Sequence, residues 1–191
     1  MPTEKEWGKE LQPRLETALL ACIDGEWTLR VDGGEKLTYA HEVLCYHADG
    51  SELRHSARYE TDLLLYDIKE NGDWIPRVVI ELKIGSITTH DALTYSTKAA
   101  THKHVYPYLR YGILVGQYGI NLPGRLIRHG TYFDFMMTWP DLDPSKTEWK
   151  DFIEVLTDEV QASRYLQSLL VESRLRGRKK FQLLHCPLRL K

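Results

Sequence analysis

VVIELKIG, residues 78–85, is the stretch of the chain that decides the fold. Its apolar residues predict a buried strand that ends at Lys83. Side chains alternate between the two faces of a strand, so Glu81 and Lys83 point to one face and Leu82 points to the other. An acid and a lysine on a buried strand are unfavourable unless they are paired or used. This strand therefore predicts either an ion pair or a chemical site.

The segment before this strand predicts its partner. Residues 58–68 are rich in Leu and Tyr, and an Asn-Gly pair at 71–72 is a strong hairpin signal because both residue types tolerate positive φ. We therefore expect an antiparallel hairpin over residues 58–83. Asp62 lies nine residues before the Asn-Gly pair and Glu81 nine residues after it. This symmetry predicts that the two carboxylates lie near each other across the ladder.

Two carboxylates in one site repel each other and raise each other's pKa unless a cation lies between them. Mg²⁺ would offset this repulsion, because proteins hold it with one or two carboxylates, waters and substrate phosphate. Asp62 and Glu81 are therefore the candidate metal ligands, with Mn²⁺ as an alternative ion. Lys83 would position or deprotonate an attacking water and offset developing negative charge. The alternative is an ordinary surface salt bridge between Glu81 and Lys83, a kind of pair that contributes little.

The rest of the chain predicts further elements from apolar periodicity and turn residues. We expect helices over residues 4–22, 89–105 and 147–176, a strand over 41–47, a strand over 111–115 and a strand pair over 126–139 with Gly130 at its turn. Strands followed by a helix and another strand favour an α/β fold with a central mixed sheet flanked by helices. The length of 191 residues fits one domain, with a core over about residues 4–116 and an elaboration over 125–180 that ends in a helical extension.

Asp62, eighteen intervening residues and then Glu81-x-Lys83 resemble the PD-(D/E)xK motif of restriction-endonuclease-like nucleases. The expected order of helices and strands over residues 4–116 agrees with that family. The resemblance implies a restriction-endonuclease-like fold and Mg²⁺-dependent phosphodiester hydrolysis. It makes Asp62 and Glu81 the metal ligands and Lys83 the catalytic lysine. One departure is that Thr61 stands where the motif has Pro.

Many members of that family add an acid from the first helix. Glu16 is the best match here, because it lies among Leu15, Leu19 and Leu20. Glu10 is the alternative, since a proline within this segment makes the helical phase uncertain. The resemblance therefore adds Glu16 to the candidate catalytic residues.

Candidate DNA contacts come from charge. The net charge is −2, yet eight of the 25 Lys and Arg residues follow residue 160, beside a single acid. A basic end on an acidic body indicates a polyanionic partner, although a solvated helix end explains it equally well. Lys98 and His102 share a helix face that would line a substrate groove or simply face solvent. Phosphate contacts of this kind add affinity without sequence information. The candidates at the basic end are Arg174, Arg176, Arg178, Lys179 and Lys180.

These features favour a Mg²⁺-dependent endonuclease that acts on DNA, most simply a restriction-type homodimer, since one compact domain carries one site and duplex cleavage needs two. A repair, junction-resolving or transposition nuclease is the nearest alternative. A non-catalytic DNA-binding or assembly module with the same fold is another alternative. A glycosidase with paired carboxylates is a third, although it leaves Lys83 without a role.

Composition and cysteine spacing indicate the cellular compartment and the state of the thiols. No apolar run approaches a membrane span, and the N-terminus MPTEKEWGKE lacks the apolar core of a signal peptide, so we expect a cytoplasmic protein without a membrane partner. Cys22, Cys45 and Cys186 are odd in number and widely spaced, which predicts buried free thiols rather than a zinc site or a disulfide framework.

Overall fold

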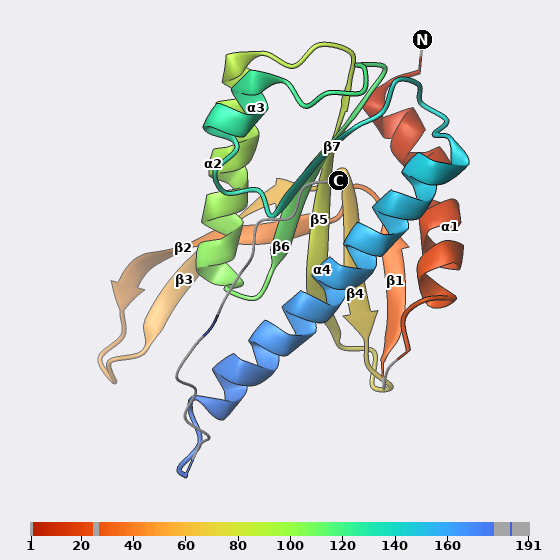
Figure 1. Ribbon diagram of the computed structural model, residues 1–191. Coiled ribbons are helices and arrows are strands. Elements are labelled where there is room, and N and C mark those ends of the chain that lie inside the picture. The colour runs from red at the N-terminus through yellow and green to blue at the C-terminus, as the bar shows by residue number, and fades with distance from the viewer. Residues whose placement is uncertain (1, 25–26, 178–183, 185–191) are drawn as a thin grey trace.

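The computed structural model describes residues 2–24, 27–177 and 184 (Figure 1). Its elements are α1 (Glu4–Leu20), β1 (Thr28–Asp32), β2 (Lys36–Tyr46), β3 (Glu52–Glu60), β4 (Leu63–Ile68), β5 (Trp74–Ile84), α2 (Thr89–Val105), β6 (Arg110–Gly116), α3 (Gly124–His129), β7 (Phe135–Thr138) and α4 (Lys146–Glu172).

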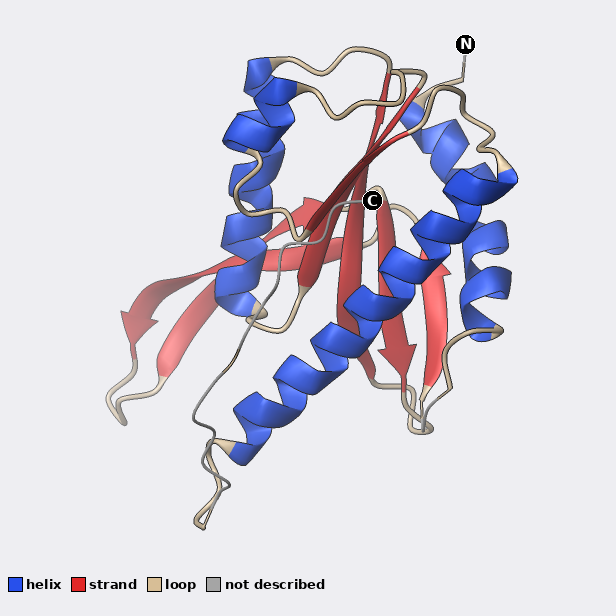
Figure 2. Ribbon diagram, in the orientation of Figure 1, coloured by secondary structure: helices blue, strands red, loops and turns tan. Residues whose placement is uncertain are grey.

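Five strands form the central sheet in the order β1-β4-β5-β6-β7. The β1–β4 and β4–β5 pairs are antiparallel, whereas β5–β6 and β6–β7 are parallel. Helices cover both faces of this sheet, and α4 closes the C-terminal part of the fold (Figure 2). The predicted α/β class, with a mixed sheet flanked by helices and a C-terminal helix, is therefore confirmed.

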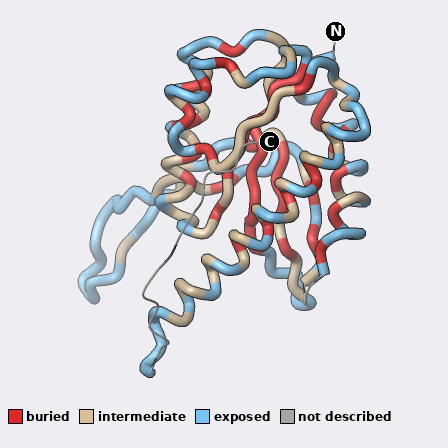
Figure 3. Tube along the Cα trace, in the orientation of Figure 1, coloured by how far each residue is buried: buried red, intermediate tan, exposed pale blue. Residues whose placement is uncertain are grey.

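The alternation of side chains along β4 and β5 creates two cores. Leu63, Ile80 and Leu82 pack with the apolar faces of α1 and α4. Leu64 and Val79 point the other way and pack with α2 and α3. Both strands are consequently buried along most of their length, as Figure 3 shows by colour. A strand covered on both faces needs the nearly continuous apolar run that the sequence displays.

The predicted hairpin is present, but it is shorter than expected. β4 pairs with β5 in a register that sets Leu63 opposite Ile80, and Gly72 adopts a φ of 85° in the turn. The prediction that residues 58–60 belong to this hairpin was wrong. They end β3, which pairs with β2 in a separate two-stranded sheet over residues 36–60, called the arm here. Thr61 lies between the end of the arm and the start of β4. Its N–H and its hydroxyl both donate to the carbonyl of Glu35, which fixes the chain at this point.

The strand pair predicted over residues 126–139 was also wrong. Residues Gly124–His129 form the short helix α3, and only Phe135–Thr138 forms a strand. Pro123 stands at the N-cap, and the N–H of Gly130 closes the helix on the carbonyl of Leu126. Short apolar segments do not distinguish helix from strand by their periodicity, and the tertiary contacts decided in favour of helix here.

The other predicted helices and the strand over residues 111–115 lie close to their predicted bounds, whereas β2 begins five residues before the predicted strand over 41–47 and β1 was not predicted. Helix α2 spans the predicted residues, and Thr88 with Asp91 forms its capping box. Helix α1 contains Pro13 without ending there. The prediction of buried thiols was wrong for Cys22 and Cys45, which are both exposed and free. None of the helices in the described part of the chain is long and apolar enough to cross a membrane.

Candidate active site

The two predicted metal ligands meet where β4 begins and β5 approaches its end. Asp62 directly precedes β4, and its Oδ2 accepts a hydrogen bond at 2.8 Å from the backbone N–H of Leu82. Since Leu63 lies opposite Ile80, the next pair outward brings Asp62 beside Glu81. Hydrogen bonding to Glu81 is one of the influences that lower the pKa of Asp62. The prediction that the hairpin places these two carboxylates together agrees with this geometry.

Glu81 is nearly inaccessible to solvent, with 1% of its surface exposed. Its Oε1 lies 2.8 Å from Nζ of Lys98, and the hydroxyl of Tyr111 donates to the same oxygen. Lys98 comes from α2 and Tyr111 from β6, so side chains from two other elements hold the carboxylate that β5 carries. Buried carboxylates require this kind of pairing, because an isolated charge in the protein interior is strongly unfavourable.

Burial governs the protonation of both acids. Burial raises the pKa of Glu81, and the charge of Asp62 adds to that rise while Lys98 opposes it. Burial likewise raises the pKa of Asp62, against the hydrogen bond from Leu82 and the charge of Lys98. Neighbouring carboxylates with raised pKa values hold negative charge reluctantly. A bound cation would relieve that cost.

Lys83 lies at the same edge. Its Nζ is 3.1 Å from Oε1 of Glu4, and the same carboxylate oxygen accepts the backbone N–H of Ile84 at 3.4 Å. The charge of Glu4 also contributes to the raised pKa of Asp62, so Glu4 stands close to the acid pair. Helix α1 therefore does supply an acid to this edge of the sheet, from its first residue.

Glu16 is not brought to this cluster. One of its oxygens lies 2.8 Å from Nη1 of Arg30 and the other accepts the N–H of Val31 at 2.9 Å, so it fastens α1 to β1. Glu10, the alternative, is exposed. Glu4 and Glu16 lie on the same helix, but twelve residues separate them, a rise of about 18 Å, so Glu16 lies far from the acid pair. The Thr3–Glu6 capping box marks the helix start and was the usable signal for Glu4.

Tyr95 completes the cluster from α2, one turn before Lys98. Burial raises the pKa of Tyr95 to about 12, and the next influences are the negative charges of Glu81, Asp62 and Glu4. Tyr95 is therefore a neutral hydroxyl beside three carboxylates. Neither Tyr95 nor Tyr111 was among the predicted site residues, and the apolar segment around Tyr111 gives no sign of the carboxylate that its hydroxyl meets.

The predicted DNA contacts have different outcomes. Lys98 belongs to the acid cluster rather than to an outer groove. His102 was wrongly placed, because it is fully buried, with Nε2 3.3 Å from the carbonyl of Leu37 on the arm. Arg174 and Arg176 are exposed beyond the end of α4. Arg178, Lys179 and Lys180 lie outside the described residues.

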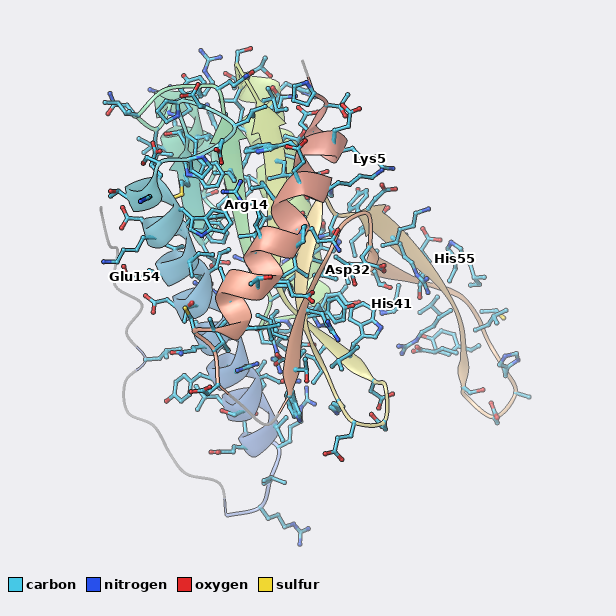
Figure 4. All side chains as sticks on the ribbon, turned by 90° about the vertical axis from the view of Figure 1, so that its right-hand side faces the viewer. Lys5, Arg14, Asp32, His41, His55 and Glu154 are labelled. Atoms are coloured by element: carbon cyan, nitrogen blue, oxygen red, sulfur yellow. The ribbon has the colours of Figure 1, made fainter. Side chains whose placement is uncertain are left out.

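The arm extends away from the helices that cover the central sheet (Figure 4). His41 and His55 lie on it, and Nδ1 of His41 is 3.1 Å from the hydroxyl of Ser56. Its base touches the candidate site, because the carbonyl of Glu60, the last residue of β3, accepts a hydrogen bond from Lys98. The acid cluster therefore lies at the junction of the arm, the central sheet and α2.

The donor set fits a hard divalent cation. Within residues 2–24, 27–177 and 184, no group of three or more His, Cys, Asp and Glu residues could together hold a metal ion. Asp62 and Glu81 nevertheless offer paired carboxylate oxygens, and Mg²⁺ needs only one or two carboxylates because it keeps several of its waters. Burial raises the pKa of both carboxyl groups against the opposing charge of Lys98, so a cation bound between them would stabilise their charged forms.

No protein-family model matches this chain, and no curated protein matches its sequence.

Proposed function

We propose that this protein is a Mg²⁺-dependent endonuclease that hydrolyses phosphodiester bonds in DNA. The observation that carries the proposal is the junction of Asp62 with the Glu81-Leu82-Lys83 segment, fixed by the 2.8 Å hydrogen bond from Leu82 to Asp62. The order of these residues along the chain and the mixed sheet that holds them agree with the PD-(D/E)xK resemblance.

The residues take the following roles in this proposal. Asp62 and Glu81 hold the ion, which when bound lowers the pKa of water and polarises the phosphodiester. Lys83, held by Glu4, orients the attacking water and offsets the charge that develops on the phosphate. Tyr111 fixes the orientation of Glu81. The exposed Arg174 and Arg176 are proposed contacts to the DNA backbone, which would give salt-dependent affinity.

We further propose that the protein acts as a restriction-type homodimer in the cytoplasm. One acid cluster cuts one strand, so a double-strand break made in one event needs two copies of the chain. A repair, junction-resolving or transposition nuclease would use the same cluster on a different DNA structure.

One observation favours a second candidate function, a DNA-binding module without activity. Lys98 already neutralises Glu81 through a direct ion pair, so the cluster has an internal counter-ion. A protein that had lost catalysis would keep such a pair as part of its core.

Incubation of the purified protein with unmethylated supercoiled plasmid, with and without Mg²⁺, tests the proposal. The endonuclease predicts nicked and linear products with Mg²⁺ and none with EDTA. Discrete fragments would show sequence specificity, and a smear would show that it is absent. A gel shift of DNA that is never cut with either Mg²⁺ or Mn²⁺ would reject catalysis and support the binding module.

A further inference from the structure

We propose that Lys98 is an internal cation which occupies the acid cluster in the absence of metal and which a divalent ion must displace from Glu81. This inference rests on the proposed metal site of the preceding section and adds a regulator of that site. Lys98 was expected to contact DNA from an outer helix face, and its position in the structure gives it a different task.

The contacts of Lys98 support this role. Its Nζ lies 2.8 Å from Oε1 of Glu81 and donates a hydrogen bond at 2.6 Å to the carbonyl of Glu60. Only 17% of the Lys98 side chain is exposed, and 1% of that of Glu81. A shielded ion pair is much stronger than one at the surface, because less water screens it. The ammonium group is therefore the resident positive charge of the cluster.

A divalent cation on Glu81 would meet this ammonium at close range. Like charges a few ångströms apart repel each other strongly where water is largely excluded. Binding of the metal therefore requires the ammonium to move away from Glu81. The ammonium can keep its hydrogen bond to the carbonyl of Glu60 as a second anchor while the flexible four-carbon stem of lysine moves it away from Glu81.

Two consequences follow from this competition. Without metal, Lys98 compensates the buried Glu81 and stabilises the junction between α2, β5 and the base of the arm. With metal, the repelled ammonium stays beside the ion, where an anionic substrate group would meet it. Lys98 thus lowers the affinity of the site for metal while keeping it assembled.

The same helix provides a matched control. Nζ of Lys103 lies 2.7 Å from Asp134 and donates at 2.7 Å to the carbonyl of Tyr132, so Lys103 also bridges one carboxylate and one carbonyl. Its side chain is 23% exposed, close to the value for Lys98. Lys103→Met therefore removes an equivalent structural bridge that serves a different carboxylate.

Calorimetric titration of the metal-free full chain with Mn²⁺, together with thermal melting, tests the inference. Lys98→Met should tighten Mn²⁺ binding about tenfold, since removal of one nearby charge in a shielded site has an effect of this order. It should also lower the melting temperature without metal and enlarge the rise that Mn²⁺ causes. Lys103→Met should lower the melting temperature while leaving Mn²⁺ affinity unchanged.

Equal or weaker Mn²⁺ binding by Lys98→Met would overturn the inference, and so would a failure of both the wild type and this variant to bind Mn²⁺. The double variant Asp62→Asn with Lys98→Met should lose the added affinity, which assigns the signal to the acid cluster. These measurements do not use DNA. Tighter binding by Lys98→Met in a protein that never cuts DNA would therefore support the inference while rejecting the proposed nuclease.

Discussion

Oδ2 of Asp62 accepts a hydrogen bond from the N–H of Leu82, the residue that stands between Glu81 and Lys83. The side chain of Asp62, directly before β4, is thereby fixed to the backbone of β5 at the centre of the Glu-x-Lys segment. The bond spans twenty residues of sequence and holds the acid pair in one arrangement. Preorganised charged groups of this kind are what metal-assisted hydrolysis requires.

Glu4, rather than Glu16, should matter for activity. Glu4→Gln should lower DNA cleavage about tenfold, because Lys83 loses the partner that orients it. Unfolding free energy should change by less than about 1 kcal/mol, since the pair is partly exposed. Glu16→Gln should cut DNA at the wild-type rate, since its contacts are to Arg30 and Val31. Cleavage rates and urea unfolding of both variants check this, and loss of cleavage only in Glu16→Gln would reverse the assignment.

Tyr111→Phe should weaken Mn²⁺ binding by at least about tenfold, because the hydroxyl that orients Glu81 is removed while the ring remains. The loss of this buried hydrogen bond should also lower the unfolding free energy by about 1–2 kcal/mol. Calorimetric titration and urea unfolding give the two quantities. Tyr132→Phe serves as the control, since Tyr132 is 53% exposed, and matching metal affinity in both variants would remove Tyr111 from the site.

His102 should make the protein sensitive to acid. Burial lowers its pKa from 6.5 to about 4, so the folded chain keeps it neutral while the unfolded chain takes up a proton near pH 6.5. Its contribution to stability is therefore complete above pH 6.5 and is lost as the pH falls toward 4, a change of roughly 3 kcal/mol.

Urea unfolding across pH 4–7.5 measures this contribution. His102→Gln should lose less stability on acidification than the wild type, whereas His41→Gln on the exposed arm should follow the wild-type profile. Parallel profiles for His102→Gln and the wild type would show that His102 is not the group that titrates.

Asp67 should be the most sensitive position outside the candidate site. It is fully buried and pairs with the buried Arg77 at 2.7 Å and with Arg164 of α4 at 2.6 Å. Asp67→Asn would leave two guanidinium groups without their carboxylate, and we expect a loss of about 3–5 kcal/mol. Thermal and urea unfolding measure it. Asp73→Asn, in the exposed turn of the same hairpin, should be nearly neutral, and equal stability of the two variants would contradict the expected effect.

Local signals were sufficient for part of the fold and of the site. The Asn-Gly turn and the apolar run before Glu81 predicted the hairpin, and hairpin symmetry placed Asp62 beside Glu81. The Thr88–Asp91 capping box located the start of α2. Each of these patterns lies within about twenty residues, and its geometry follows from regular strand or helix periodicity.

The errors came from contacts that are distant in sequence. His102 is fully buried against the carbonyl of Leu37 and the rings of Tyr59 and Tyr111, and no pattern within α2 predicts these contacts. Glu4 reaches Lys83 only because α1 docks with its N-terminus at the end of β5. Helix α3 replaced a predicted strand because six residues are too few for periodicity to decide. Long-range packing determined all three outcomes.

The most direct test of the central claim is the rate of plasmid cleavage in Mg²⁺ by Asp62→Asn and by Lys83→Met, each beside a matched control. The controls are Asp73→Asn, at the far end of the same hairpin, and Lys150→Met, on the exposed face of α4. Loss of several kcal/mol of transition-state stabilisation predicts at least about a hundredfold fall in rate for both site variants, with DNA binding retained. The controls should cut at the wild-type rate. Undiminished cleavage by both site variants would contradict the assignment of Asp62 and Lys83 to the active site.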